Sequence, residues 1–352
     1  MEVAMSLSPL HRVSFPGLLA AGLVATGLLL AGCSGTDDDS PPDPSLDPRG
    51  QAPVEVGAAR ADAAPLPEGA QARSLLGDVL FPPPLDPDLR AEREANLEEA
   101  IAERDADPDE PEGWIWVGRH QAYLGEYRDA VETFSQGWER FSGDARFLRH
   151  RGHRHLTLRD FDGAIADLAR GIDEAGEAMG EIEPDGLPNP LGIPLTTLGF
   201  NLWYHRALAE YLKGDFETAL ASWRSTLEVS DNPDLQVATR YWLHLTLRQL
   251  GRDAEALEAI AAIDSDTEVI ENASYRDLIL FFRGELDDET LLGDPEEGLA
   301  AVTTLYGVAA HHLLEGDEVE ARARFQEILE RPEQWPAFGY VAAEAEVARR
   351  GW

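Results

Sequence analysis

Hydrophobic positions fall into three patterns along the chain. Between Val13 and Leu30 the sequence is almost continuously apolar, whereas residues 34–72 hold almost no large apolar side chain. From residue 86 onwards, apolar residues recur every three to four positions, which predicts helices with one buried face. No convincing strand-like alternation interrupts this pattern. It therefore predicts an all-α fold behind a long polar segment.

The first apolar run reads as a targeting segment. It follows His11 and Arg12, and its length of about 18 residues could just span a bilayer. Its position and its ending, Leu-Ala-Gly-Cys at residues 30–33, resemble the signal of bacterial lipoproteins. That resemblance implies a signal peptide over residues 1–32 and a lipid-carrying Cys33. An uncleaved membrane anchor with an incidental cysteine is the alternative.

The same resemblance implies an address in the bacterial cell envelope. Ser34 after the cysteine is similar to a sorting preference for the outer membrane, so we expect a lipid-anchored protein facing the periplasm. A triacylated cysteine provides stable anchoring, because it carries more than one acyl chain. The translation start stays open between Met1 and Met5.

The polar segment behind the cysteine predicts a disordered tether over residues 33–72. Residues 34–72 contain seven prolines and eight acidic residues, a composition that cannot bury a core. We expect ordered chain from about Ser74. An extended strip follows and ends at Phe81, and a helix then starts with Asp86 as N-cap and proline in its first position.

A repeat of 34 residues organises the helical part. Gly118 and Gly152 are 34 positions apart, and so are Ala130 and Ala164. Each pair of positions sits in the same context, with a small residue in one helix, a turn that precedes an aromatic residue, and an alanine in the next helix. A fixed period of this length indicates stacked helical hairpins that bury a core only together.

The order of small, aromatic and alanine positions resembles the tetratricopeptide repeat (TPR). The resemblance implies a TPR-type helical-hairpin solenoid of about five units plus flanking helices. The predicted parts are an extended segment and half-repeat helix (73–110), TPR units (111–263) with a Pro-rich insertion (176–199), an irregular helical pair (264–301), and a TPR-like unit with a capping helix (302–352).

The insertion carries four prolines and the turn signals Asp185-Gly186 and Asn189-Pro190. Together with residues 201–205 it resembles a group of bacterial envelope TPR proteins of unassigned function. That likeness bears on fold and not on activity. The insertion reads either as a loop that covers an exposed edge of the stack or as a lid or wall beside a binding groove.

Charge narrows the range of partners. The chain has 66 acidic residues against 29 Lys plus Arg, a formal net charge of −37. Such a charge argues against nucleic acid as the main partner and against electrostatic binding to anionic lipid. The single cysteine excludes a disulfide framework and a cysteine-based zinc site.

A basic island stands out against this background. Residues 146–159 contain five arginines, three histidines and no acid. We keep three interpretations: internal charge compensation, an anion or peptide site, and metal binding by His150, His153 and His155. Glu132, Glu139, Asp160 and Asp167 are candidate partners for compensation.

The TPR resemblance implies which side chains line the concave face. The candidate ligand- or partner-binding residues are Arg119, Tyr123, Arg146, Arg149, His153, Tyr204 and Tyr211.

Enzyme motifs are absent. The sequence has no phosphate loop, nucleophile elbow, His-Glu-x-x-His motif or catalytic cysteine, so we expect no catalytic residues, no cofactor and no metal. We expect a lipid-anchored scaffold or adaptor that binds a protein or peptide partner, acidic if the island forms the site, through its concave face. The alternative is a binding protein for an anionic small molecule or polymer, and an enzyme with an unrecognised site is a third hypothesis. Nothing in the sequence indicates the oligomeric state.

Overall fold

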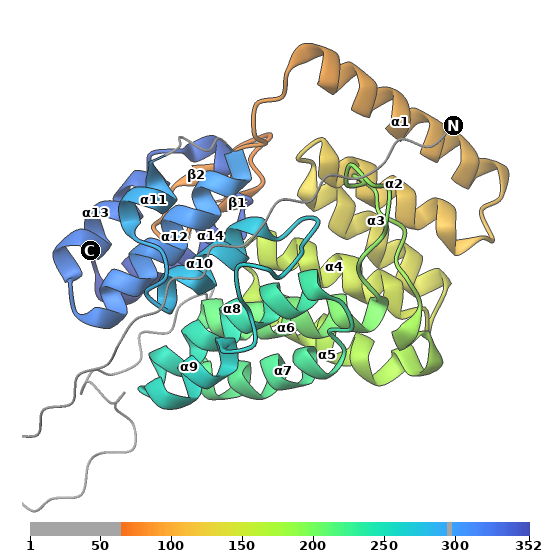
Figure 1. Cartoon of the computed structure of the whole chain (residues 1–352). Coiled ribbons are helices and arrows are strands. Elements are labelled where there is room, and N and C mark those ends of the chain that lie inside the picture. The colour runs from red at the N-terminus through yellow and green to blue at the C-terminus, as the bar shows by residue number, and fades with distance from the viewer. Residues whose placement is uncertain (1–64, 294–297) are drawn as a thin grey trace, which may run out of the picture. The chain divides into compact units, whose positions relative to one another are not determined.

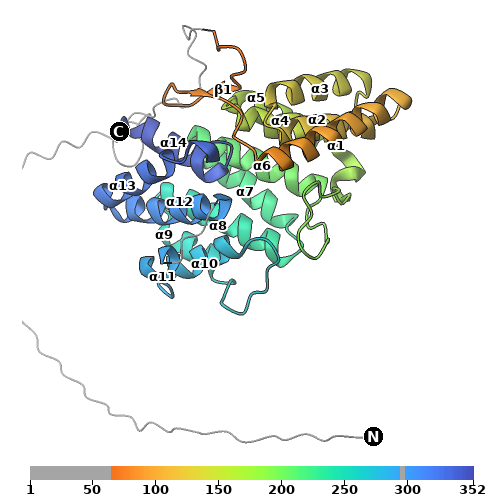
Figure 2. The same ribbon diagram turned by 90° about the horizontal axis from the view of Figure 1, so that it is seen from above.

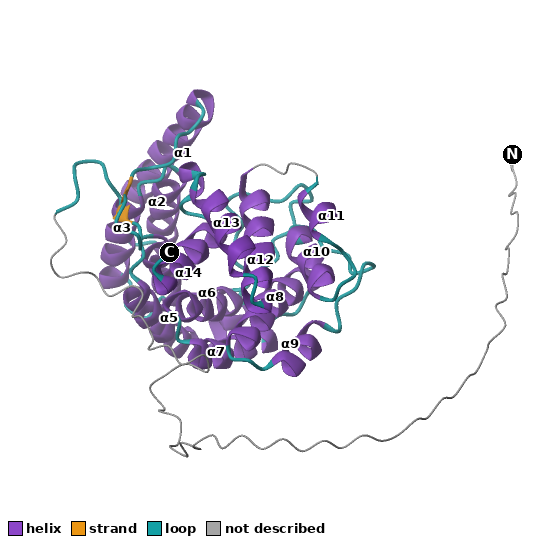
Figure 3. Ribbon diagram, turned by 90° about the vertical axis from the view of Figure 1, so that its left-hand side faces the viewer, coloured by secondary structure: helices purple, strands orange, loops and turns teal. Residues whose placement is uncertain are grey.

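A computed structural model describes residues 65–293 and 298–352, and helices account for most of this part of the chain (Figure 3). The prediction of an all-α fold is confirmed. The α-helices are α1 Pro87–Ala106, α2 Pro111–Tyr123, α3 Tyr127–Arg140, α4 Ala145–Thr157, α5 Phe161–Ala175, α6 Leu198–Lys213, α7 Phe216–Glu228, α8 Pro233–Gln249, α9 Asp253–Ile260, α10 Ala273–Phe282, α11 Asp288–Leu292, α12 Gly298–Glu315, α13 Glu318–Leu329 and α14 Phe338–Arg350. Two 3₁₀ turns, η1 Gly176–Gly180 and η2 Pro332–Gln334, and two short strands, β1 Ala72–Arg73 and β2 Val79–Leu80, complete the described elements.

The helix boundaries follow local chemistry. The side chain of Asp86 accepts hydrogen bonds from the backbone N–H of Asp88 (2.9 Å) and of Leu89, and Pro87 occupies the first turn, so the predicted N-cap is confirmed. Several helices end at turns with positive φ, such as Gly125 (+82°) and Gly214 (+97°). Glycine adopts this conformation without the clash that a Cβ would cause.

Consecutive helices pack against each other from α1 to α9 (Figure 1). The small residues of the 34-residue period lie where paired helices approach. A Cβ at Gly118 would lie 2.4 Å from the ring of Phe134, and one at Gly152 would lie 2.6 Å from Leu168. Ala130 and Ala164 are fully buried. The spacing in the sequence therefore marks close helix–helix contacts.

The last helices return onto the earlier ones. The hydroxyls of Tyr211 on α6 and Tyr306 on α12 are 2.9 Å apart, and the ring of Tyr306 lies 5.7 Å from that of Trp242 on α8. Helix α14 packs against α12, α13 and α6, and residues 339–347 are all buried. A helix at this position was predicted as a cap. The structure buries it, because it is covered by helices from both halves of the described chain.

The N-terminal strip joins the C-terminal helix. Ala72 and Arg73 of β1 pair antiparallel with Leu80 and Val79 of β2, and both views in Figures 1 and 2 show these strands next to α14. The backbone N–H of Leu75 donates to Glu344 on α14 (3.1 Å). Ala70 and Ala72 are already buried, so the predicted tether boundary at residue 72 is too late. Small alanines that become buried by backbone pairing leave no apolar pattern in the sequence.

The predicted signal peptide, Cys33 and most of the predicted tether lie outside the described residues. No helix of the described part of the chain is long and apolar enough to cross a membrane.

Candidate functional site

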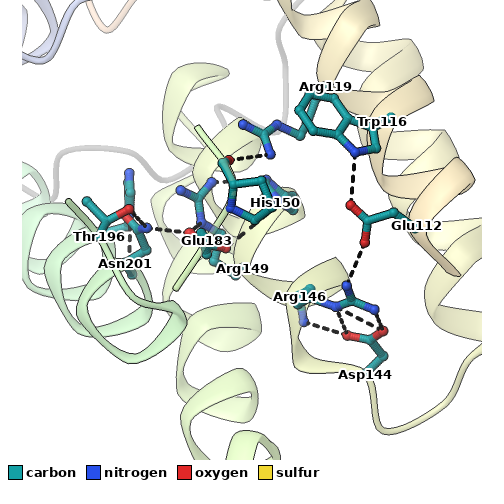
Figure 4. A network of polar contacts seen from close by, with 12 residues as sticks. Glu112, Trp116, Arg119, Asp144, Arg146, Arg149, His150, Glu183, Thr196 and Asn201 are labelled. Carbon is teal, nitrogen blue, oxygen red and sulfur yellow. Dashed lines mark hydrogen bonds and ion pairs between the residues drawn. The ribbon is translucent and has the colours of Figure 1, made fainter. Parts of the chain in front are cut away.

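The insertion crosses the face of helices α2 and α4. Residues 181–197, here called the strap, leave η1, run over this face and return to α6, and Ile182 and Thr197 form an antiparallel bridge at its base. Figure 4 shows Glu183 of the strap between Arg149 on α4 and Asn201 on α6. The strap therefore brings an acidic side chain into the basic island. This placement is compatible with both interpretations of the insertion, a loop that covers the stack and a wall beside a groove.

The centre of the contact is a buried ion pair. Arg149 Nε lies 2.9 Å from a carboxylate oxygen of Glu183, and their side chains are 14% and 9% exposed. The amide of Asn201 donates to the same carboxylate and also to the Thr196 hydroxyl (2.9 Å). Burial lowers the pKa of Arg149, and the Glu183 carboxylate opposes this effect. Because both charges are largely removed from water, each depends on the other for its stability.

Arg119 holds the next residues of the strap. Its Nη1 donates to the carbonyl oxygen of Pro184 (2.9 Å), and its Nε donates to the hydroxyl of Tyr123 (3.3 Å). Gly186 passes so close that a Cβ there would lie 1.9 Å from the Tyr123 hydroxyl oxygen. The guanidinium also lies 4.3 Å from the ring centre of Trp116. The strap is thus fitted to the predicted site residues Arg119 and Tyr123, and neither has a carboxylate partner among the described residues.

Most of the remaining basic island is neutralised by acids. Internal charge compensation is therefore the correct interpretation for these members of the island, and the prediction of Arg146 as a free binding residue is wrong. Their neighbours in space are acids on the helices or turns that pack beside α4. The pairs are Arg146 with Asp144 (2.6 Å) and Glu112 (2.8 Å), Arg151 with Asp167 (2.6 Å), His155 with Asp160 (2.9 Å), and Arg159 with Glu344 (2.7 Å).

Arg154 is the exception. Among the described residues its side chain has no hydrogen-bond or ion-pair partner, and its guanidinium lies 5.4 Å from the ring centre of Tyr127. Burial lowers its pKa to about 10, and the nearby guanidiniums of Arg149 and Arg119 act in the same direction. Arg93 on α1 reaches the same region, where it donates to the backbone oxygen of Tyr123.

We call Arg93, Arg119, Arg149 and Arg154 the basic face. Among the described residues, Glu183 is the one carboxylate paired with any of them. The local balance of these five side chains is therefore strongly positive in a chain whose net charge is −37. Guanidiniums in this arrangement are suited to bidentate, charge-assisted hydrogen bonds with carboxylate or phosphate groups.

The chain matches no protein-family model and no curated protein sequence. The case for a site therefore rests on the geometry of these side chains.

Three predicted residues lie away from the basic face or beneath the surface. His153 packs against the ring of His205, with centroids 4.2 Å apart, and against Phe338 of α14. Tyr204 is buried and accepts a hydrogen bond from Trp242 (2.8 Å). Tyr211 is fully buried by its contact with α12, so the prediction that it lines an open groove is wrong. The return of α12 and α14 over α6 is the physical reason.

The histidines of the island do not form a metal site. His150 stacks on Phe134, His153 packs at a tilt against His205, and His155 bonds Asp160. Within residues 65–293 and 298–352, no group of three His, Cys, Asp or Glu side chains is placed to hold a metal ion.

Sequence reasoning missed two members of this site. Glu183 lies in the Pro-rich insertion, where its local sequence says only that the chain turns. The signal that could have found it is the surplus of positive charge in residues 146–159, which requires an acid from elsewhere in the chain. Arg93 belongs to a helix that the pattern placed outside the full repeats, so its contact with Tyr123 required the tertiary structure.

The buried histidines beside the site predict a dependence of stability on pH. Burial lowers the pKa of His205 to about 3, and the Arg149 guanidinium acts in the same direction. Between the unfolded pKa of about 6.5 and the folded pKa, the unfolded chain takes up a proton that the folded chain does not. The contribution of neutral His205 to the free energy of unfolding is therefore complete above pH 6.5. It falls by up to about 1.4 kcal/mol per pH unit as the pH is lowered.

We expect His205→Gln to make the free energy of unfolding depend less steeply on pH between about pH 6.5 and pH 4.5. The decrease in slope corresponds to at most one fewer proton taken up on unfolding. Urea unfolding of the wild type and the variant across this range measures the two slopes. Identical slopes would contradict a neutral His205 in the folded protein.

Proposed function

We propose that this protein is a helical-repeat adaptor of the bacterial cell envelope that binds an acidic segment of a partner protein at the basic face. One observation carries the proposal. Arg93 and Arg119 bond Tyr123, and Arg154 lies over the ring of Tyr127. Arg149 pairs with Glu183, which is the one carboxylate among the described residues that pairs with any of these four arginines. An acidic partner supplies the missing counter-charges.

The TPR assignment belongs to this proposal. It is supported by the 34-residue period, by the close contacts of Gly118 and Gly152 with the following helix, and by the buried alanines at corresponding positions. Solenoids of this kind use the side chains of successive helices as one extended binding surface. The basic face follows this principle, because α2 and α4 belong to successive units.

Electrostatics favours binding of an acidic segment at the basic face over the rest of the surface. The acid-rich remainder of the chain repels an acidic segment, so a productive encounter is favoured where the local charge is positive. Arg154 is a partly buried cation without a partner among the described residues. A carboxylate of the ligand would offset the cost of removing this charge from water.

The cellular location is proposed from the N-terminal sequence. A lipid on Cys33, followed by a polar segment rich in proline and acids, would hold the helical domain at the outer membrane on its periplasmic side. The absence of recognised enzyme motifs supports a binding role rather than catalysis.

A fluorescent hexaglutamate peptide is the probe for this function. We expect saturable binding, a loss of affinity of about tenfold or more for Arg154→Ala and for Arg119→Ala, and weaker binding as salt is raised. Fluorescence anisotropy measures the dissociation constants. Arg170→Ala is the matched control, because Arg170 lies on α5 in an exposed ion pair with Glu174 (2.7 Å) and is expected to leave binding unchanged.

Unchanged affinity in both basic-face variants would contradict the proposal. The alternative, a small anionic ligand, is tested with citrate and inorganic phosphate. Tight binding of either one by the same arginines, without binding of the peptide, would replace the adaptor with a small-anion binding protein.

A further inference from the structure

A second cavity lies beside the basic face and is chemically different from it. It has a volume of about 490 Å³, opens to solvent, and is lined by α6, α8, α10 with the turn before it, α12, the start of α14 and the end of the strap. Elements from both halves of the described chain therefore converge on it. Its volume falls within the usual range of small-molecule sites, about 300–1,000 Å³.

Aromatic rings form much of the wall. Phe200 and Tyr204 stack on each other along α6, with centroids 5.3 Å apart, and Tyr275 and Phe338 enter from α10 and α14. Such rings bind apolar bodies through their area, and their faces attract cations.

The imidazole, amide and carboxylate groups of the wall offer acceptors, and the hydroxyls of Thr196, Ser274 and Tyr275 can donate or accept. His205 bonds the backbone oxygen of Asn201 through Nδ1 (2.6 Å), so the neutral ring carries its proton there and presents Nε2 as an acceptor. Asn201 and Asn272 use their amide N–H groups on Glu183 and on the backbone oxygen of Asp234, which leaves their side-chain oxygens. Glu271 accepts one hydrogen bond from Asn189 and keeps further acceptor capacity. The imidazole, amide and carboxylate acceptors favour a ligand that brings hydrogen-bond donors.

The charges of the side chains around the cavity also favour a positively charged ligand. Glu271 is the one charged side chain among the described residues that line the cavity, which include no lysine or arginine. Asp234, directly behind it, is buried and accepts backbone hydrogen bonds from Ile270, Glu271 and Asn272, so its negative charge reinforces this end of the cavity. His205, at the α6 side, is neutral near pH 7 because burial lowers its pKa to about 3.

We propose that this cavity binds a small primary ammonium compound with an aromatic or aliphatic body. The ammonium group lies at the end formed by Glu271 and Asn272, where acceptors and negative charge meet. The apolar body lies between Phe338, Phe200 and Tyr275. This orientation keeps the positive charge away from the His205 end, which is next to Arg149 of the basic face. The inference does not depend on the acidic partner proposed above.

Other ligand classes fit less well. An anion would find no cation among the described lining residues and would meet the charges of Glu271 and Asp234. An uncharged sugar could use the acceptors, but it would gain nothing from that local negative charge. The test therefore compares an amine with its neutral counterpart.

The probes are 2-phenylethylamine, which is charged near pH 7, the matched alcohol 2-phenylethanol, and the disaccharide sucrose. Titration of the full-length protein, followed by calorimetry and by NMR of the tyrosine rings, measures binding. We expect saturable amine binding, about tenfold weaker binding of the alcohol, and a loss of about fivefold in amine affinity for Glu271→Gln. Tyr275→Leu should weaken both aromatic probes.

Arg154→Ala serves as the control, because it alters the basic face and leaves this cavity intact. The proposal is overturned if the alcohol binds as tightly as the amine, if Glu271→Gln has no effect, or if no probe saturates at about 10 mM. Binding of sucrose without binding of the amine would also overturn it and would indicate a carbohydrate site. Loss of hexaglutamate binding, by contrast, bears on the basic face alone.

Discussion

Glu344→Ala is expected to lower the free energy of unfolding by about 3–5 kcal/mol, because it leaves the buried guanidinium of Arg159 without its carboxylate. The side chains of Arg159 and Glu344 are 3% and 1% exposed. Two nitrogens of Arg159 donate to the two oxygens of Glu344, at 3.1 and 2.7 Å. This pair joins the end of α4 to α14, so its loss weakens the contact between distant parts of the chain.

The surroundings of this pair increase the expected effect. Arg159 also donates to the backbone oxygens of Thr157 and Trp335, and Glu344 accepts the backbone N–H of Leu75. The N-terminal strip, the second helical hairpin and the last helix therefore meet at one buried pair.

The backbone at Arg159 offers a second test of the same pair. Arg159 has φ +69° and is the one non-glycine residue at positive φ in the described part of the chain, at a turn position where other hairpins carry glycines such as Gly125 and Gly214. The conformation costs about 1 kcal/mol for a residue with a Cβ. Arg159→Gly should therefore destabilise less than Arg159→Ala, by about that amount.

Urea unfolding followed by circular dichroism measures these differences. Arg170→Ala, in an exposed ion pair, should change stability by less than about 1 kcal/mol. If Glu344→Ala were no more destabilising than Arg170→Ala, the pair would not hold these segments together.

Glu183→Gln is expected to release the strap and to strengthen binding of the hexaglutamate peptide. The substitution keeps the size of the side chain and removes the charge that pairs with Arg149. A charge-assisted hydrogen bond contributes about 1.5–3 kcal/mol, so an external carboxylate that no longer competes with Glu183 should bind about tenfold or more tightly. The Asn201 contact also weakens, because its amide donates to that carboxylate.

Two measurements follow the release. Hydrogen exchange should become faster at the backbone N–H of Glu183, which bonds the Thr196 oxygen (3.0 Å), and of Leu198, which bonds the Glu181 oxygen (2.9 Å). Anisotropy titration gives the peptide affinity. Asp185→Asn is the matched control, since Asp185 is an exposed acid of the same strap without an arginine partner among the described residues. Weaker peptide binding in Glu183→Gln than in wild type would show that Glu183 supports the site rather than competing for it.

Those parts of the fold that depend on local sequence patterns could be predicted from the sequence. Apolar spacing predicted helices, Asp86 and Pro87 predicted a helix start, and the spacing of Gly118 and Gly152 predicted the period of the hairpins. These features depend on residues near one another in the chain, so one sequence suffices to read them.

The candidate site could be predicted from the sequence only in part. The excess of arginine at residues 146–159 identified the region, and Arg119, Tyr123 and Arg149 do lie together. Arg146 and Tyr211 were misplaced, because nearby acids neutralise the first and α12 buries the second. A charge pattern does not reveal which distant acid returns to it.

The sequence by itself determined the helical class, the period of the hairpins and the presence of a basic island in an acidic chain. Only the tertiary structure decided that α14 and the N-terminal strip fold onto the earlier helices, that Glu183 occupies the basic face, and that Arg154 stays without a partner among the described residues. The physical reason is one of range. Helical periodicity and capping are local, whereas buried ion pairs and cavities join residues far apart in the chain, as Arg159 and Glu344 show.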